Sequence, residues 1–275
     1  MTDKEIKFRE KKEINQIISD TFLFLKQEYK NILKMTGIYI LPFIFMNALL
    51  QVHVQRKIIG KIDIYDAEAI MENFGPVYLN FFMASLFAIF VQSLLIGTFY
   101  TYLEAYIKEG KGKFSAADIT PDFFSNSLQA LTANLVLFLF ITAGVLLCIL
   151  PGIYLGNTFS ILVFIYLFEK KNLGQSLHRS FRLVNIQWWN TLLINITGLA
   201  FIYFAGVILS LPTLMAGSGP DAGALQEAGT GGYNDLYWLW TGVSAAVTSL
   251  LWVVPYTFLA FQYFNLDERS KTTGL

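Results

Sequence analysis

The residues with the most chemical character are two arginines around a serine, followed by a tryptophan pair: Arg179, Ser180, Arg182, Trp188 and Trp189. Guanidinium groups bind phosphate and carboxylate oxygens through paired hydrogen bonds, and a hydroxyl adds one more. This combination predicts a dock for a lipid phosphate or for an acidic segment of a protein partner. In the simpler interpretation, both arginines only extend toward the headgroups of a membrane surface.

A second set of polar residues lies inside long apolar segments. Each of five segments contains an uncharged amide, and the set is Asn47, Gln92, Asn134, Asn157 and Asn195. Such side chains either hydrogen-bond neighbouring helices to one another or line a polar path for a ligand. No ionisable residue lies near the middle of these segments, which argues against a proton-coupled or voltage-driven carrier.

We expect no catalytic, cofactor or metal site. The two histidines, His53 and His178, are expected on opposite sides of a membrane, and Cys148 is the single cysteine. These residues cannot build a histidine-rich or multi-cysteine metal centre. Neither a nucleophile elbow, nor a phosphate loop, nor a dinucleotide motif occurs. The sequence therefore predicts a protein that is not an enzyme and does not bind nucleic acid.

The elements that must position these residues are six apolar segments. About 20 helical residues cross a hydrocarbon core of roughly 30 Å. Only 15% of the residues are charged, against about 25% in a soluble domain. We predict an all-α, polytopic membrane protein with six transmembrane helices over residues 32–52, 77–106, 128–150, 153–168, 191–214 and 238–264.

Charge fixes the predicted orientation. All but three of the 20 Lys and Arg lie on one side of this layout, the exceptions being Arg56, Lys57 and Lys61. Basic flanks stay cytoplasmic, so both termini are expected there, and the first segment is expected to be a permanent anchor. The chain is read as one membrane domain, with a cytoplasmic segment over 1–31, a bundle over 32–264 and a cytoplasmic tail over 265–275.

The six helices are expected to form three hairpins, each preceded by a cytoplasmic in-plane amphipathic helix. The in-plane helices are predicted over residues 14–25, 115–126 and 173–188, with Pro121 in the first turn of the second. In the first, Glu28 is placed off the apolar stripe. In the third, the stripe is Leu173, Leu177, Phe181, Val184 and Trp188.

Glycine and proline predict how the helices connect and pack. Pro151-Gly152 predicts a tight turn between the third and fourth segments. The small residues Gly152 and Gly156, and Gly242 and Ala246, predict close helix packing, either within the chain or at a dimer face. Residues 215–236 contain six glycines and predict a flexible outer loop, while a short interfacial helix is expected within 53–76.

One stretch resembles a known family. Its residues are Leu150-Pro151-Gly152-Ile153-Tyr154-Leu155, then Glu169, then Ser176–Val184 and Trp188-Trp189. They resemble the signature of a bacterial inner-membrane family of unknown function, similar to the membrane domain fused to some glycerophosphodiester phosphodiesterases. Asn185-Ile186-Gln187 departs from the small residue usual before the tryptophans. The resemblance implies a stand-alone module of the bacterial cytoplasmic membrane and transfers no catalytic residue.

The expected function is that of a scaffold or accessory subunit in a cell-envelope assembly. Its expected partners are the lipid bilayer and other membrane proteins, and the oligomeric state stays open. The alternative is a transporter or lipid-handling protein that uses the five amides, Asn47 to Asn195, as a polar path between helices.

Overall fold

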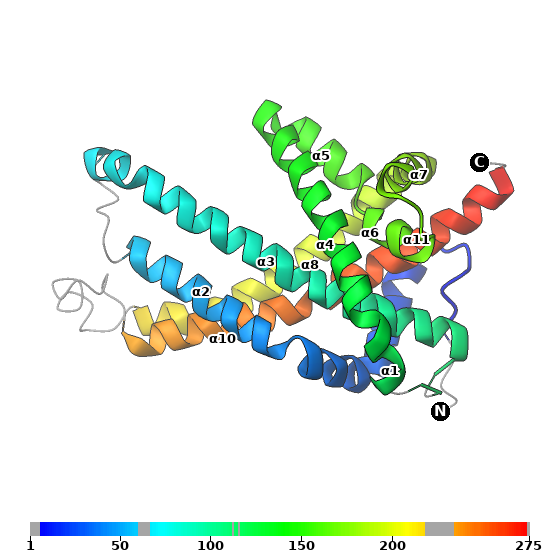
Figure 1. The fold of residues 1–275 in the computed structure, drawn as a ribbon, viewed down its shortest axis with the longest axis horizontal. Coiled ribbons are helices and arrows are strands. Elements are labelled where there is room, and N and C mark those ends of the chain that lie inside the picture. Colours follow the sequence, from blue (N-terminus) through cyan, green and yellow to red (C-terminus); the bar gives the residue numbers. More distant parts are fainter. Residues whose placement is uncertain (1–5, 60–66, 112, 115, 218–233, 274–275) are drawn as a thin grey trace. The chain divides into compact units, whose positions relative to one another are not determined.

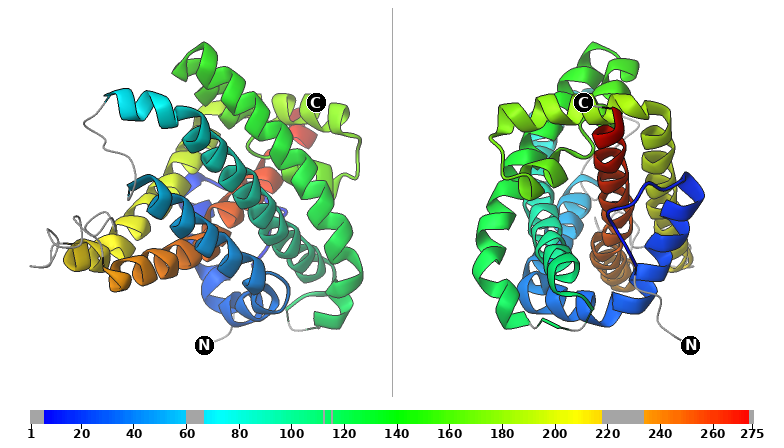
Figure 2. Two further views of the ribbon diagram at one scale, coloured as in Figure 1. Left: turned by 60° about the vertical axis from the view of Figure 1, so that its left-hand side comes forward. Right: turned by 90° about the vertical axis from the view of Figure 1, so that its right-hand side faces the viewer.

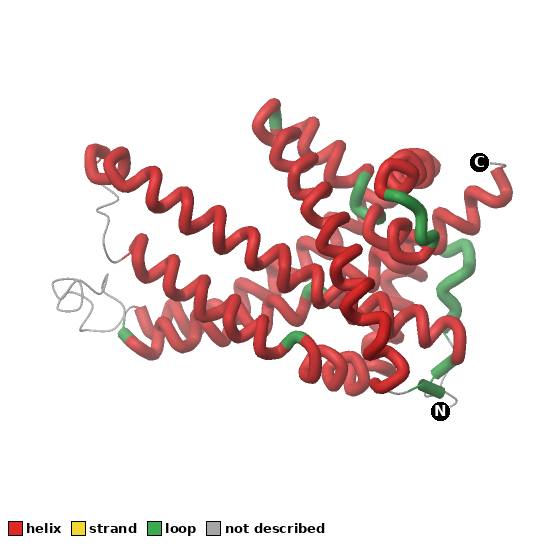
Figure 3. Tube along the Cα trace, in the orientation of Figure 1, coloured by secondary structure: helices red, strands yellow, loops and turns green. Residues whose placement is uncertain are grey.

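The computed structural model describes residues 6–59, 67–111, 113–114, 116–217 and 234–273. Every regular element in these ranges is a helix (Figures 1 and 3). The predicted flexible loop falls mainly on residues outside these ranges. A short interfacial helix, expected within 53–76, is not a separate element in the described part of that stretch, because residues 53–59 and 67–76 belong to two long helices. The helices are α1 (Ile14–Tyr39), α2 (Leu41–Ile59), α3 (Ala67–Glu109), α4 (Ala116–Leu147), α5 (Ile149–Thr158), α6 (Leu162–Phe168), α7 (Leu173–Ile186), α8 (Trp188–Gly217), α10 (Asp235–Leu251) and α11 (Val253–Thr273).

The all-α membrane architecture agrees with the sequence prediction. Five stretches of the described chain are long and apolar enough to cross a membrane, and a sixth arises if α1 and α2, bent at Ile40, count as one broken span. Pro42 follows that bend and lacks the N–H that would continue the helix. The five stretches are Phe74–Glu109, Thr120–Leu147, Ile149–Phe168, Trp188–Met215 and Asp235–Thr272.

The chain forms two compact units. The first contains residues 1–39, 93–201 and 252–275, and the second contains residues 40–92 and 202–251. The prediction of one membrane domain over 1–275 stays a prediction.

The core of the first unit joins both ends of the chain. Phe8 stacks on Phe261 with ring centroids 4.1 Å apart, and Phe24 meets Phe8 edge-on at 5.1 Å. The backbone N–H of Lys12 donates to Oδ1 of Asn265 at 2.9 Å. Residues 265–273, expected in a tail, therefore continue α11 and pack against the N-terminal segment.

The second unit is held by close helix contacts. A Cβ added at Gly242 on α10 would lie 3.5 Å from Val52 on α2. Nε1 of Trp240 donates to the carbonyl oxygen of Leu209 on α8 at 2.7 Å. The small residue Gly242 thus faces a neighbouring helix, as its pattern predicts.

Two of the three predicted in-plane segments are not separate helices. Helix α1 runs unbroken from Ile14 to Tyr39, and α4 runs unbroken from Ala116 to Leu147 with Pro121 inside it rather than in its first turn. Apart from Pro121 in α4, neither helix contains a proline. Their glycines, Gly37 and Gly144, lie near the C-terminal ends, so no helix-breaking residue separates an in-plane segment from the span. Only the third segment, α7, ends before its span, at Gln187 with φ −142° and ψ 57°.

The predicted Pro-Gly turn is placed differently. The chain reverses at Cys148, whose backbone is extended, and Pro151 and Gly152 lie within α5. Proline is tolerated there because the first helical N–H groups have no intrahelical partner. Gly152 lets α5 pack closely against α4, since an added Cβ would lie 2.6 Å from Val145. A Cβ added at Gly156 would lie 3.4 Å from Ile141 on the same helix. The predicted close packing of Gly152 and Gly156 is confirmed.

Candidate functional site

The fourth span is broken inside the first unit. Helix α5 ends at Thr158 and α6 begins at Leu162, so the carbonyls before the gap lose their helical partners. Other donors replace them. The backbone N–H and Oγ of Ser160 donate to the Asn157 carbonyl at 3.3 and 2.9 Å, and Oγ of Ser180 donates to the Thr158 carbonyl at 2.8 Å. Irregular backbone at membrane depth is tolerated only with such partners.

The side chains at the break tie α5 to α8. Nδ2 of Asn157 donates to the Trp188 carbonyl at 3.1 Å, and its Oδ1 accepts from Nδ2 of Asn195 at 2.9 Å. Nε1 of Trp188 donates to Oγ1 of Thr158 at 3.3 Å. Thus Asn157, Asn195, Ser180 and Trp188, predicted as parts of two separate sites, lie together and bond within the protein.

A cluster of charges fixes α7 on its other side. Arg179 contacts Oε1 of Glu169 at 3.4 Å through Nε, and through Nη2 it contacts Asp267 at 3.0 Å and Ser270 at 3.3 Å. Only 19% of its side chain is exposed. We call these residues, with Lys171 and Lys271, which pair with Glu169 and Asp267, the Arg179 cluster. Figure 2 shows α7 running across α11 in the right-hand view.

The buried and exposed faces of α7 differ from the predicted stripe. The buried residues are Ser176, Ser180, Leu183 and Val184. Phe181, predicted on the apolar stripe that faces the membrane, is exposed and lies off the buried face, where small serines let α7 approach its neighbours. Arg182 is exposed and forms no ion pair within the described residues, and Trp189 is 72% exposed.

The remaining amides do not join this site. Nδ2 of Asn134 donates to Oγ of Ser93 at 2.9 Å, linking α4 to α3. Asn47 and Gln92 belong to the second unit. Asn47 is buried, and its Oδ1 accepts no hydrogen bond from the part of the chain that the structure describes. The amides of the first unit are thus separate interhelical contacts.

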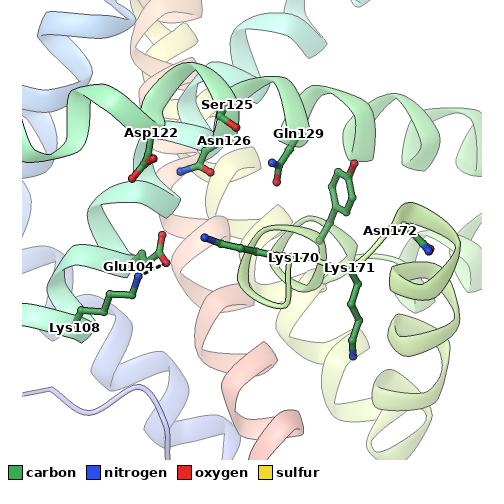
Figure 4. A pocket seen from close by; sticks show the side chains of 10 residues that line it. Glu104, Lys108, Asp122, Ser125, Asn126, Gln129, Lys170, Lys171 and Asn172 are labelled. Atoms are coloured by element: carbon green, nitrogen blue, oxygen red, sulfur yellow. Dashed lines mark hydrogen bonds and ion pairs between the residues drawn. The ribbon is translucent and has the colours of Figure 1, made fainter.

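A polar cavity of about 430 Å³ lies beside the link between α6 and α7 (Figure 4). Its walls come from the end of α3, the start of α4 and residues 170–172. Lys170 adopts φ 48°, a left-handed conformation that turns the chain at this point. The lining residues are Glu104, Lys108, Asp122, Ser125, Asn126, Gln129, Tyr166, Lys170, Lys171 and Asn172.

Sequence reasoning missed Glu28. This residue, expected on a polar face, is completely buried. The Tyr102 hydroxyl donates to its Oε2 at 2.5 Å, Nδ2 of Asn31 donates to the same oxygen at 2.8 Å, and Nζ of Lys111 lies 3.8 Å from Oε1. The signal was present, because the buried face Ile17, Thr21, Phe24, Glu28 and Ile32 follows helical spacing.

Within the described residues, no group of three or more His, Cys, Asp or Glu is arranged to hold a metal ion. Among known protein families, curated proteins and solved structures, none matches this chain. The family resemblance of residues 150–189 stays a prediction.

Proposed function

We propose that this protein is a non-catalytic scaffold or accessory subunit of an assembly in the bacterial cytoplasmic membrane. The observation that carries the proposal is the way α7 is held. Its inner face bonds the broken fourth span through Ser180, and Arg179 ties it to α6 and α11. A helix fixed from both sides offers a rigid outer surface, which lowers the entropy cost of binding a partner.

The outer surface of α7 has the chemistry of a dock. It presents the exposed Phe181 and Arg182, and Trp189 follows at the start of α8. Aromatic residues and arginine carry most of the binding energy in protein interfaces. In the proposal, α7 lies in the membrane interface, Arg182 meets an acidic segment of the partner, and Trp189 packs against an apolar part of it.

The six-span layout with three hairpins and both ends in the cytoplasm belongs to the same proposal. Contacts between the chain ends support it, because Nη2 of Arg269 lies 3.1 Å from Glu13 and Nζ of Lys11 donates to Thr272 at 3.0 Å. Ends in contact lie on one side of a membrane, which requires an even number of crossings. The basic flanks favour the cytoplasmic side.

The internal use of the amides favours a scaffold over a transporter. Asn157, Asn195 and Asn134 each hydrogen-bond another residue of the first unit. Interhelical bonds of this kind stabilise packing by about 0.6 kcal/mol each. A path for a ligand would instead need such groups turned toward an open channel.

The test is purification of the protein from its native membrane in a mild detergent, followed by mass spectrometry of co-purifying proteins. We expect a partner in stoichiometric amount. Its recovery should fall about tenfold or more in Trp189→Ala, since interface tryptophans are frequent hot spots, and should also fall in Arg182→Ala. Absence of any stoichiometric protein, or equal recovery with all variants, would contradict the proposal.

Two controls separate docking from folding. Lys34→Ala removes an exposed cation on α1 and should leave recovery unchanged. Arg179→Ala removes the centre of the Arg179 cluster, so it should lower the unfolding temperature as well as the recovery. Arg182→Ala and Trp189→Ala should lower recovery alone, and a matching loss of stability in them would indicate a structural role.

A further inference from the structure

The polar cavity beside the α6–α7 link has the size of a ligand site. Its volume of about 430 Å³ lies within the roughly 300–1,000 Å³ of small-molecule pockets. It is lined largely by charged and amide side chains, so any occupant must offer charges and hydrogen-bonding groups. The cavity belongs entirely to the first unit.

The charges of the cavity do not all pair with one another. Lys108 donates to Glu104 at 2.7 Å, and Lys171 pairs with Glu169. Asp122 and Lys170 have no ion pair within the described part of the chain. Figure 4 shows the amine of Lys170 extending toward the side where Asp122 and Glu104 lie, while Lys171 points away. The cavity thus offers one carboxylate and one ammonium group to a ligand.

A second polar cavity of the first unit lacks this property. It has a volume of about 410 Å³ and lies between the N-terminal segment and the start of α1. Lys7 pairs with Glu10, and Lys12 pairs with Asp20. Lys11 donates to Thr272. The charged groups of the second cavity therefore already have partners within the protein. The first cavity differs because it contains both an acidic and a basic side chain without an ion pair in the described part of the chain.

Helix α4 also carries exposed apolar side chains, on a different face from the residues that line the first cavity. Along α4, directly after Asp122, Phe124 is 78% exposed and Leu128 is 66% exposed. Both belong to the candidate span Thr120–Leu147. The cavity itself lies where three candidate spans end, because Glu104, Asp122 and Tyr166 are near the ends of Phe74–Glu109, Thr120–Leu147 and Ile149–Phe168. Lipid headgroups lie at the level where spans leave the hydrocarbon core, so this position favours a lipid over a solute.

We propose that the cavity binds the zwitterionic phosphoethanolamine headgroup of a phospholipid. Lys170 contacts the phosphate, Asp122 accepts hydrogen bonds from the primary ammonium group, and the amide of Gln129 is available to the phosphate oxygens. The acyl chains extend from the cavity into the bilayer. This site is distinct from the outer face of α7 and goes beyond the proposed scaffold function.

The experiment measures retained lipid. The delipidated protein in detergent is mixed with equal amounts of phosphatidylethanolamine and phosphatidylglycerol, and bound lipid is counted by native mass spectrometry. We expect phosphatidylethanolamine to be preferred. Asp122→Asn should reduce that preference roughly threefold to fivefold, the effect of about one charge contact, and Lys170→Gln should weaken binding of both lipids. Lys26→Gln, on the exposed face of α1, is the matched control.

The outcomes decide the proposal. Equal retention of the two lipids by the unchanged protein, or an unchanged preference in Asp122→Asn, would overturn it. Free phosphoethanolamine is added in a separate arm. If free phosphoethanolamine binds with the same dependence on Asp122 while no lipid is retained, the ligand is a soluble phosphoethanolamine compound and the assignment to a phospholipid is wrong. Phosphatidylcholine, whose quaternary ammonium cannot donate to Asp122, should bind more weakly than phosphatidylethanolamine, and equal binding would also count against the proposal.

Discussion

Glu28 is the most constrained single residue of the first unit. Its carboxylate is completely buried and accepts hydrogen bonds from Tyr102 and Asn31, with Lys111 nearby. A carboxylate removed from water is costly unless such partners surround it. The three partners come from α1, α3 and the residues after α3, so Glu28 ties the first helix to the end of the third.

Glu28→Ala should therefore destabilise the protein. The change leaves the Tyr102 hydroxyl and the Asn31 amide without their acceptor, which costs about 1–3 kcal/mol for a buried group. The thermal unfolding temperature of the purified protein in detergent measures the effect. Glu28→Gln keeps an acceptor oxygen and should lose less.

Glu13→Ala is the control for loss of a carboxylate. Glu13 also forms an ion pair, with Arg269, but its side chain is 75% exposed. Exposed pairs contribute at most about 1 kcal/mol. Equal losses in Glu13→Ala and Glu28→Ala would show that burial of Glu28 carries no special weight.

At the scale of helices, the crossing of α3 and α4 depends on one glycine. A Cβ added at Gly97 would lie 2.5 Å from Oγ of Ser127 and 2.6 Å from its Cα. The obstacle includes backbone, so no side-chain rotation relieves it. Gly97→Ala should push the helices apart at a cost of about 1–3 kcal/mol, the usual range for overpacking, and lower the unfolding temperature.

Gly37 on α1 provides the comparison. An added Cβ there meets nothing within 4 Å. Because glycine inside a helix is less favourable than alanine by roughly 0.5–1 kcal/mol, Gly37→Ala should be neutral or stabilising. If Gly97→Ala and Gly37→Ala changed the unfolding temperature by the same amount in the same direction, a tight α3–α4 crossing would be refuted.

The sequence predicted which segments are apolar helices but not where they break. Hydropathy alone identifies the long apolar runs, because about 20 uncharged residues leave few alternatives. The gap between α5 and α6 contains neither glycine nor proline. The carbonyls at this gap accept hydrogen bonds from the hydroxyls of Ser160 and Ser180. Because Ser180 is distant in the sequence, local sequence patterns could not predict the gap.

The predicted sites fared similarly. The residue types alone indicated that Arg179, Ser180 and Asn157 need hydrogen-bond partners, and each has one in the structure. Whether the partner is a ligand or another helix depends on tertiary packing, which spacing along one helix does not encode. The cavity of Asp122 and Lys170 was missed for the same reason, since its two charges are far apart in the sequence.

For the whole molecule, Cys148 provides a test of topology. It is the only cysteine of the chain, it is exposed, and it lies at the turn between α4 and α5. With both ends in the cytoplasm, this turn should face outward. A membrane-impermeant maleimide should label Cys148 in right-side-out vesicles and should not label it in inverted vesicles.

A second thiol makes the result independent of vesicle orientation. In a Cys148→Ser background, Thr272→Cys near the end of α11 should be labelled only in inverted vesicles. Three predicted spans separate these positions, so they should lie on opposite sides. Labelling of both positions from the same side would contradict the six-span layout.

The helices also differ in how they transmit a load. Helix α4 is continuous over 32 residues, a rod of about 48 Å at 1.5 Å per residue. Helices α7 and α8 instead meet at one non-helical residue, Gln187. A load on the first turn of α4 therefore passes along one continuous helix to the turn at Cys148. A load on α7 passes instead through the contacts of Ser180 and Arg179 into Thr158, α6 and α11, which brace the joint at Gln187. In mechanical terms, the first unit combines a stiff lever with a braced arm.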